Sequence, residues 1–112
     1  MASDDQRAKA GPLSLEVAQG EDVVTVRLGG ELDLSGAPGV EAAVEEAIAD
    51  ADRRLVIDFS GLTFIDSTGI AILVAAMGDE RAAGRLGFVP SRAPAVTRVL
   101  RLTGVEERLP LA

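Results

Sequence analysis

Residues 58–69 read DFSGLTFIDSTG and connect an apolar strand to an apolar helix. The strand begins at Leu55, and its nearly continuous apolar run is typical of a strand buried on both faces of a parallel sheet. From Thr68 onward the pattern changes to helical spacing, with Ile70, Leu73, Val74 and Met77 on the core face. The sequence therefore predicts a strand-to-helix junction at residues 66–69.

The rest of the chain extends this unit in both directions. The same periodicities predict hairpin strands at 13–17 and 24–28, helices at 37–50 and 94–103, a strand at 86–89 and an edge segment at 107–109. Gly84 is the expected C-cap of the helix that begins near Thr68. Because strand-helix-strand crossovers are right-handed, we expect an α/β fold: an open mixed sheet of four to five strands with the main helices packed on one face.

The chain has 112 residues, which is enough for one compact domain. Residues 1–11 lack periodic apolar positions and predict a flexible N-terminal tail, which leaves residues 12–112 as the single domain. The N-terminus is polar and acidic, unlike a signal peptide. The longest apolar stretch, residues 69–77, is shorter than the roughly 20 residues that span a bilayer. We therefore expect a cytoplasmic protein with no membrane contact.

The charge balance predicts the kind of partner. Asp and Glu number 18 against 11 Lys and Arg, which gives a net charge of −7. Nucleic acid is a poor partner for such a surface, since binding to it depends on neutralising phosphates. An acidic domain is better suited to a protein surface that presents Arg and Lys.

The residue types that are missing restrict the chemistry. The sequence contains no His and no Cys, which excludes Ser-His-Asp and Cys-His catalysis and ordinary zinc sites. No GxxxxGK[ST] phosphate loop is present either, so nucleotide hydrolysis would lack its usual lysine. The expectation is a protein that is not an enzyme, with no catalytic residues, no metal site and no cofactor of its own.

Ser67 has two interpretations on the basis of the residues alone. A Ser or Asp before a helix commonly accepts a hydrogen bond from a free N–H of the first turn, and this capping role is the stronger interpretation. The alternative is phosphorylation, because the first turn of a helix also favours negative charge. A phosphate there would then act through clash and charge at a partner's surface, with Asp66 adding repulsion.

A second polar segment, GELD at residues 30–33, ends the second predicted strand. It is interpreted either as a polar turn, with Asp33 or Ser35 capping the first helix, or as a rim of carboxylates beside Ser67. In the second case Glu31 and Asp33 would meet a basic partner surface.

Taken together, these motifs resemble the STAS family, and within it the stand-alone anti-sigma factor antagonists of bacteria. The resemblance covers residues 13–110 and depends on three motifs in order: GELD at 30–33, VIDF at 56–59 leading into FIDSTG at 64–69, and SRAPAV at 91–96 continuing to Leu102-Thr103-Gly104. The chain departs from the family pattern after GELD, where many relatives carry Ser or Thr and this sequence has Leu34-Ser35-Gly36-Ala37.

The resemblance implies a partner switch controlled by phosphorylation. The unphosphorylated protein would bind an anti-sigma factor that is also a serine kinase and so release a sigma factor, phosphorylation of Ser67 would end the interaction, and a serine phosphatase would restore it. ATP and magnesium would belong to the kinase. The implied partner-binding residues are Glu31, Asp33, Asp66, Ser67, Thr68 and Gly69, in a monomer or weak dimer.

Two other functions remain open at this point. A STAS domain can also serve as a non-enzymatic adaptor subunit of a membrane transport complex, in which case the partner would supply the membrane contact. A nucleotide could also bind at the rim formed by Asp33 and Ser67.

Overall fold

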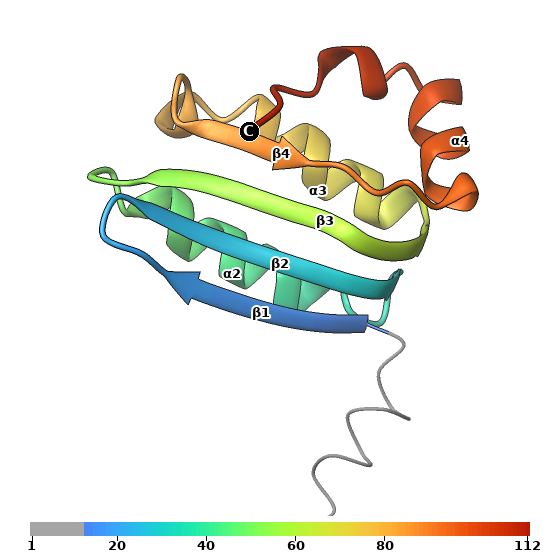
Figure 1. Ribbon diagram of the computed structural model, residues 1–112, viewed down its shortest axis with the longest axis horizontal. Coiled ribbons are helices and arrows are strands. Elements are labelled where there is room, and N and C mark those ends of the chain that lie inside the picture. Colours follow the sequence, from blue (N-terminus) through green and yellow to red (C-terminus); the bar gives the residue numbers. More distant parts are fainter. Residues whose placement is uncertain (1–12) are drawn as a thin grey trace, which may run out of the picture.

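A computed structural model describes residues 13–112 of the chain, so the predicted tail at residues 1–11 lies outside the described residues. Its centre is one sheet with the strand order β1-β2-β3-β4 (Figure 1). The strands are β1 (Leu13–Gln19), β2 (Val23–Leu32), β3 (Arg54–Ile65) and β4 (Leu86–Val89). Strand β1 runs antiparallel to β2, whereas β2-β3 and β3-β4 are parallel pairs. The predicted open mixed sheet is confirmed, with four strands.

Helices α2 (Ala37–Ala49) and α3 (Ser67–Met77) lie side by side behind the sheet in Figure 1. Strand residues alternate between the helical side and the opposite face, so every second side chain enters the core. The central strands contribute mainly Val24, Val26, Leu28, Leu55, Ile57 and Phe59. The third helix, α4 (Pro94–Leu102), packs against β3 and adds Val96 and Leu100 to the same core.

The opposite face of the sheet carries a charged row across three strands. Arg27 of β2 donates to Glu16 of β1 at 3.1 Å and to Asp58 of β3 at 3.5 Å. The register places these three residues directly opposite one another. Because opposite charges alternate along the row, the polar residues stabilise the strand pairing on a face that α2 and α3 leave uncovered.

Strand β3 extends well past the predicted end, to Ile65 instead of Phe59. Residues 60–65 continue the strand, and Gly61 pairs with Gly29 at a register shift. A Cβ on Gly61 would lie 3.3 Å from the Gly29 Cα, so the two glycines let the backbones approach closely at the irregularity. The pairing of β2 and β3 therefore continues to the residues of the predicted site.

The prediction for the end of α3 was wrong. The helix ends at Met77 with Gly78 as its C-cap, and Gly84 has no part in it. The reason is that the Asp79 side chain accepts a bond from the N–H of Arg81 and starts a separate 3-10 helix, η1 (Glu80–Ala82). Gly84, with φ of 79°, instead supplies the left-handed residue of the turn before β4.

The predicted edge segment at 107–109 was also wrong. Most of that range belongs to the 3-10 helix η2 (Glu106–Arg108). The contact with β4 comes two residues later, where Phe88 donates to the Pro110 carbonyl at 2.8 Å and accepts from Ala112 at 2.9 Å. This short segment covers the outer edge of β4 and so protects its backbone groups from pairing with other chains. No helix among residues 13–112 has the length and apolarity needed to cross a membrane.

Candidate functional site

The two polar motifs meet at the carboxyl ends of β2 and β3. Leu32 and Ile65 are partners in the parallel register, and the N–H of Asp66 donates to the Leu32 carbonyl at 3.1 Å. Asp33 and Asp66 each follow one of these paired residues. The two carboxylates therefore leave neighbouring strands at the same edge of the sheet, as the interpretation of a carboxylate rim requires.

Gly30 sets the direction in which the GELD segment leaves the strand. Its φ of 80° lies in the left-handed region, and the register of β2 against β3 shifts between Gly30 and Glu31. A residue with a Cβ is strained in this conformation, which explains the glycine. After the shift Leu32 is fully buried while Glu31 is exposed, so the motif places one side chain in the core and one carboxylate on the surface.

Asp66, not Ser67, caps α3. Its backbone is extended, and its carboxylate accepts hydrogen bonds from the N–H groups of Thr68 at 2.9 Å and Gly69 at 3.1 Å. Ser67 is the first helical residue and is exposed, whereas Thr68 is half-buried and Gly69 buried. The capping interpretation of Ser67 was therefore wrong, and the Ser67 hydroxyl stands at the surface next to an occupied cap.

Replacing Asp66 by Ala is expected to lower the free energy of unfolding by about 1 kcal/mol, because two N–H groups of the first turn lose their acceptor. Asp66→Asn is the matched control, since an Asn side chain caps a helix about as well as Asp and carries no charge. Urea denaturation followed by circular dichroism measures both. Equal stability of Asp66→Ala and the wild type would contradict the capping role.

Asp33 holds the turn that follows β2. Its Oδ1 accepts from the Ser35 hydroxyl at 2.7 Å and from the Ser35 N–H at 3.0 Å, and its carbonyl accepts from Gly36 and Ala37. The hydrogen bond from the Ser35 hydroxyl, and to a smaller extent the one from the Ser35 N–H, lowers the pKa of Asp33 below its usual value, so the carboxylate is ionised at neutral pH. The expected capping of the first helix by Asp33 or Ser35 was wrong, because Gly36 is the N-cap of α2 and has no side-chain bond to offer.

Ser91 is a supporting residue to which the sequence assigned no role. It is buried, its hydroxyl donates to the Leu62 carbonyl at 2.7 Å, and its oxygen accepts from the N–H of Ala93 at 2.9 Å. These bonds join the last part of β3 to the start of α4 and so help to hold the strand that ends at Asp66. The available signal was the polar first residue of the third motif, SRAPAV.

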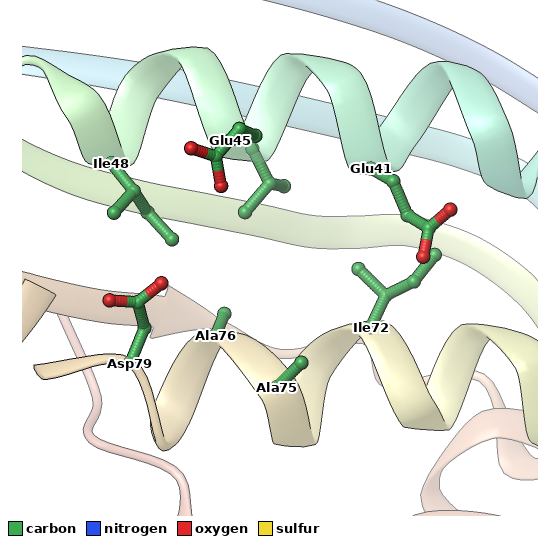
Figure 2. Close-up of a pocket in the computed structure, with 8 residues that line it drawn as sticks. Glu41, Glu45, Ile48, Ile72, Ala75, Ala76 and Asp79 are labelled. Carbon is green, nitrogen blue, oxygen red and sulfur yellow. The ribbon is translucent and has the colours of Figure 1, made fainter. Parts of the chain in front are cut away.

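A groove on the helical layer lies apart from this edge (Figure 2). It lies between α2 and α3, with Ile48 and Ile72 among the apolar residues that line it and Glu41, Glu45 and Asp79 beside them. Arg81 donates to both Glu45 and Asp79 at 2.8 Å and offsets part of their negative charge. Among residues 13–112 no group of three or more acidic side chains is arranged to hold a metal ion.

Nearly all of the described chain matches known proteins of one family. A family model described as "Mlab, STAS domain" matches residues 15–111. The anti-sigma-F factor antagonist RsfB of Mycobacterium tuberculosis is 33% identical over 95 residues, which cover 85% of this chain and 77% of RsfB.

Solved structures give the same result. An anti-sigma factor antagonist from Mycobacterium paratuberculosis superposes with a TM-score of 0.76 at 34% identity, covering 88% of this chain and 84% of that one. The anti-sigma factor antagonist SpoIIAA of Bacillus, in its unphosphorylated form, superposes with a TM-score of 0.72 at 23% identity, covering 88% of both chains. SpoIIAA has also been solved in a phosphorylated form, which superposes with a TM-score of 0.65 at 22% identity and covers 88% of this chain and 91% of that one.

Proposed function

Because the chain belongs to the STAS family, we propose that it is an anti-sigma factor antagonist whose binding is switched off by phosphorylation of Ser67. The observation that carries this proposal is the division of roles at the start of α3. Asp66 satisfies the first-turn N–H groups, and the neighbouring Ser67 is exposed. A kinase can therefore reach the hydroxyl without first breaking the helix.

The unphosphorylated surface is suited to a basic partner. Glu31, Asp33 and Asp66 lie at one edge of the sheet around Ser67, and Asp33 stays ionised at neutral pH. Such an edge attracts a partner surface that carries Arg or Lys, which speeds association and fixes orientation. In the proposed function this partner is an anti-sigma factor with serine kinase activity, and binding to it frees a sigma factor.

The switch follows from the charge that phosphorylation adds. A phosphoserine carries about −1.5 to −2 charges. At the first residue of a helix this charge is favourable to the helix itself, so the fold is retained. Against a partner surface packed onto Ser67, the same group adds bulk and repulsion, to which the adjacent carboxylate of Asp66 contributes. The helix tolerates the phosphate, whereas the bound partner is displaced.

The chemistry of the cycle belongs to the partners. The kinase binds ATP and magnesium and transfers the γ-phosphoryl group to the Ser67 Oγ, which loses its proton while ADP is released. A serine phosphatase then hydrolyses the ester to serine and inorganic phosphate. In this scheme the chain supplies the acceptor oxygen and a binding surface, and it has no cofactor of its own.

Incubation with the cognate kinase and magnesium-ATP is expected to add one phosphate per chain, detected by intact-mass spectrometry. Ser67→Ala should add none. Ser60→Ala is the matched control, because Ser60 is another exposed serine, seven residues earlier on β3, and its loss should leave the stoichiometry at one. A full phosphate on Ser67→Ala would refute the assignment of the acceptor.

The names of the relatives favour this function over the adaptor and nucleotide-binding interpretations. RsfB, SpoIIAA and the Mycobacterium paratuberculosis protein are all described as anti-sigma factor antagonists.

A further inference from the structure

Two large apolar side chains are exposed beside the proposed phosphorylation site. Phe64 is 42% exposed although it directly precedes the buried Ile65, and Leu34 is 72% exposed two residues after the buried Leu32. The other two phenylalanines, Phe59 and Phe88, are 0% and 1% exposed and pack edge to face in the core. The core therefore accommodates aromatic rings, and Phe64 is the one phenylalanine of the three that the fold leaves at the surface.

The backbone fixes both side chains at the carboxyl ends of the paired strands. Phe64 is opposite Glu31 in the register, one residue before the Leu32-Ile65 pair. Leu34 lies between Asp33 and Ser35, in the turn that the hydrogen bonds from Ser35 to the Asp33 carboxylate hold in place. The two apolar groups thus sit on the same rigid elements that carry Glu31, Asp33 and Ser67.

We infer that Phe64 and Leu34 are the apolar anchors of the interface at which the anti-sigma factor binds. The occupant is a partner surface with an apolar pocket bordered by Arg or Lys side chains. Two features specify it: an aromatic side chain of the type enriched at interface centres, and flanking carboxylates that require cationic neighbours for a complementary fit. This inference depends on the proposed function and deepens it by assigning the attractive part of the contact.

The inference also explains how one phosphate can end a contact. Apolar anchors gain affinity only when water is excluded around them. A phosphate on Ser67, three residues after Phe64, has to keep its water or find a cationic partner. The same edge would then carry both an apolar contact that attracts the partner and, after phosphorylation, a charge that keeps water in the interface and so prevents that contact.

Leu34 further predicts partner selection. Leu34 offers an apolar contact in the turn after GELD, where a Ser or Thr would offer a hydrogen bond. A partner built to hydrogen-bond there would leave a polar group unpaired against Leu34, which lowers its affinity. Anti-sigma factors that accept this chain are therefore expected to present an apolar side chain to this turn.

The test measures binding of the unphosphorylated chain to the anti-sigma kinase by isothermal titration calorimetry. Phe64→Ala is expected to weaken binding at least tenfold, and Leu34→Ser at least threefold. Val17→Ala is the matched control: Val17 is also 42% exposed, but it pairs with Val26, six residues and so about 20 Å along β2 from Leu32. This control should bind like the wild type, and circular dichroism melts should show all three variants folded.

Each outcome has a distinct meaning. Wild-type affinity in both Phe64→Ala and Leu34→Ser would overturn the anchor inference while leaving the proposed function intact. No binding of the wild type to the kinase would instead count against the proposed function. A second copy of this chain is the other partner that could cover the surface, and sedimentation at micromolar concentration tests for it. If the wild type is a dimer and Phe64→Ala is a monomer, the surface is a contact between copies of the chain and the inference is overturned.

Discussion

Phosphorylation of Ser67 is expected to lower the affinity for the anti-sigma kinase about 10⁴-fold. A switch that turns a 99:1 bound population into 1:99 requires a differential affinity of about 5.5 kcal/mol. The added dianion meets Asp66 and Asp33 on its own side, and the closing partner would have to strip its water. Truncating one side chain in an interface seldom costs that much, so this is the largest effect expected for the protein.

Titration calorimetry measures this effect by comparing the affinity of the singly phosphorylated chain with that of the unphosphorylated chain. Ser67→Asp and Ser67→Glu are expected to fold normally, because a negative side chain is favourable in the first turn of a helix, and to bind poorly. Ser67→Ala should bind like the unphosphorylated wild type, which separates loss of the hydroxyl from gain of charge. Undiminished binding of the phosphorylated chain would contradict the switch.

The second large effect is expected at Gly69, where Gly69→Ala should lower the free energy of unfolding by about 2 kcal/mol. A Cβ on this residue would lie 2.7 Å from the Ile65 Cγ1 and 2.8 Å from the Leu32 Cγ. Both neighbours are buried, so either they or the start of α3 must move. Since Ser67 is in the same turn, its position should shift as well.

Gly39→Ala is the matched control for this prediction, because Gly39 is also a helical glycine near the start of its helix. A Cβ there would have the Leu15 Cδ2 as its only close neighbour, at 3.8 Å, which is an ordinary contact. Replacement should therefore raise stability by about 0.4–1 kcal/mol through the lower entropy of the unfolded chain. Urea unfolding of the two variants should show opposite signs, and equal signs would contradict the packing argument for Gly69.

Sequence periodicity predicted the hairpin and two of the helices, because these elements depend mainly on residues close together in the chain. Alternation found the hairpin, and helical spacing placed α2 and α4 to within one residue at each end. The failures occurred where a side chain or a neighbouring strand overrode the local signal. Asp79 started a separate turn after α3, and β3 continued through Ser60-Gly61 because Gly29 on the next strand let it approach.

The candidate site divides in the same way. The sequence left two interpretations of residues 30–33, a polar turn or a carboxylate rim beside Ser67, and the parallel pairing of β2 and β3 brings these residues and residues 66–69 to one edge. Which residue caps α3 could not be predicted, because Ser and Asp both cap helices and the two residues are adjacent in the sequence. Only the position at which the helix begins shows that Asp66 is the cap. The exposure of Phe64 was equally hidden, since its place in an apolar run is typical of a core residue.

The sequence by itself determined that this is an α/β domain with a net negative charge and a serine at a strand-to-helix junction, because hydrophobic period, charge and residue type are properties of the chain. Only the tertiary structure decided that Asp66 holds the helix end, that Ser67 is therefore left exposed, and that Phe64 faces outward. These facts depend on the register of β2 against β3 and on the space left beside Leu32 and Ile65, and both arise from contacts between segments more than thirty residues apart.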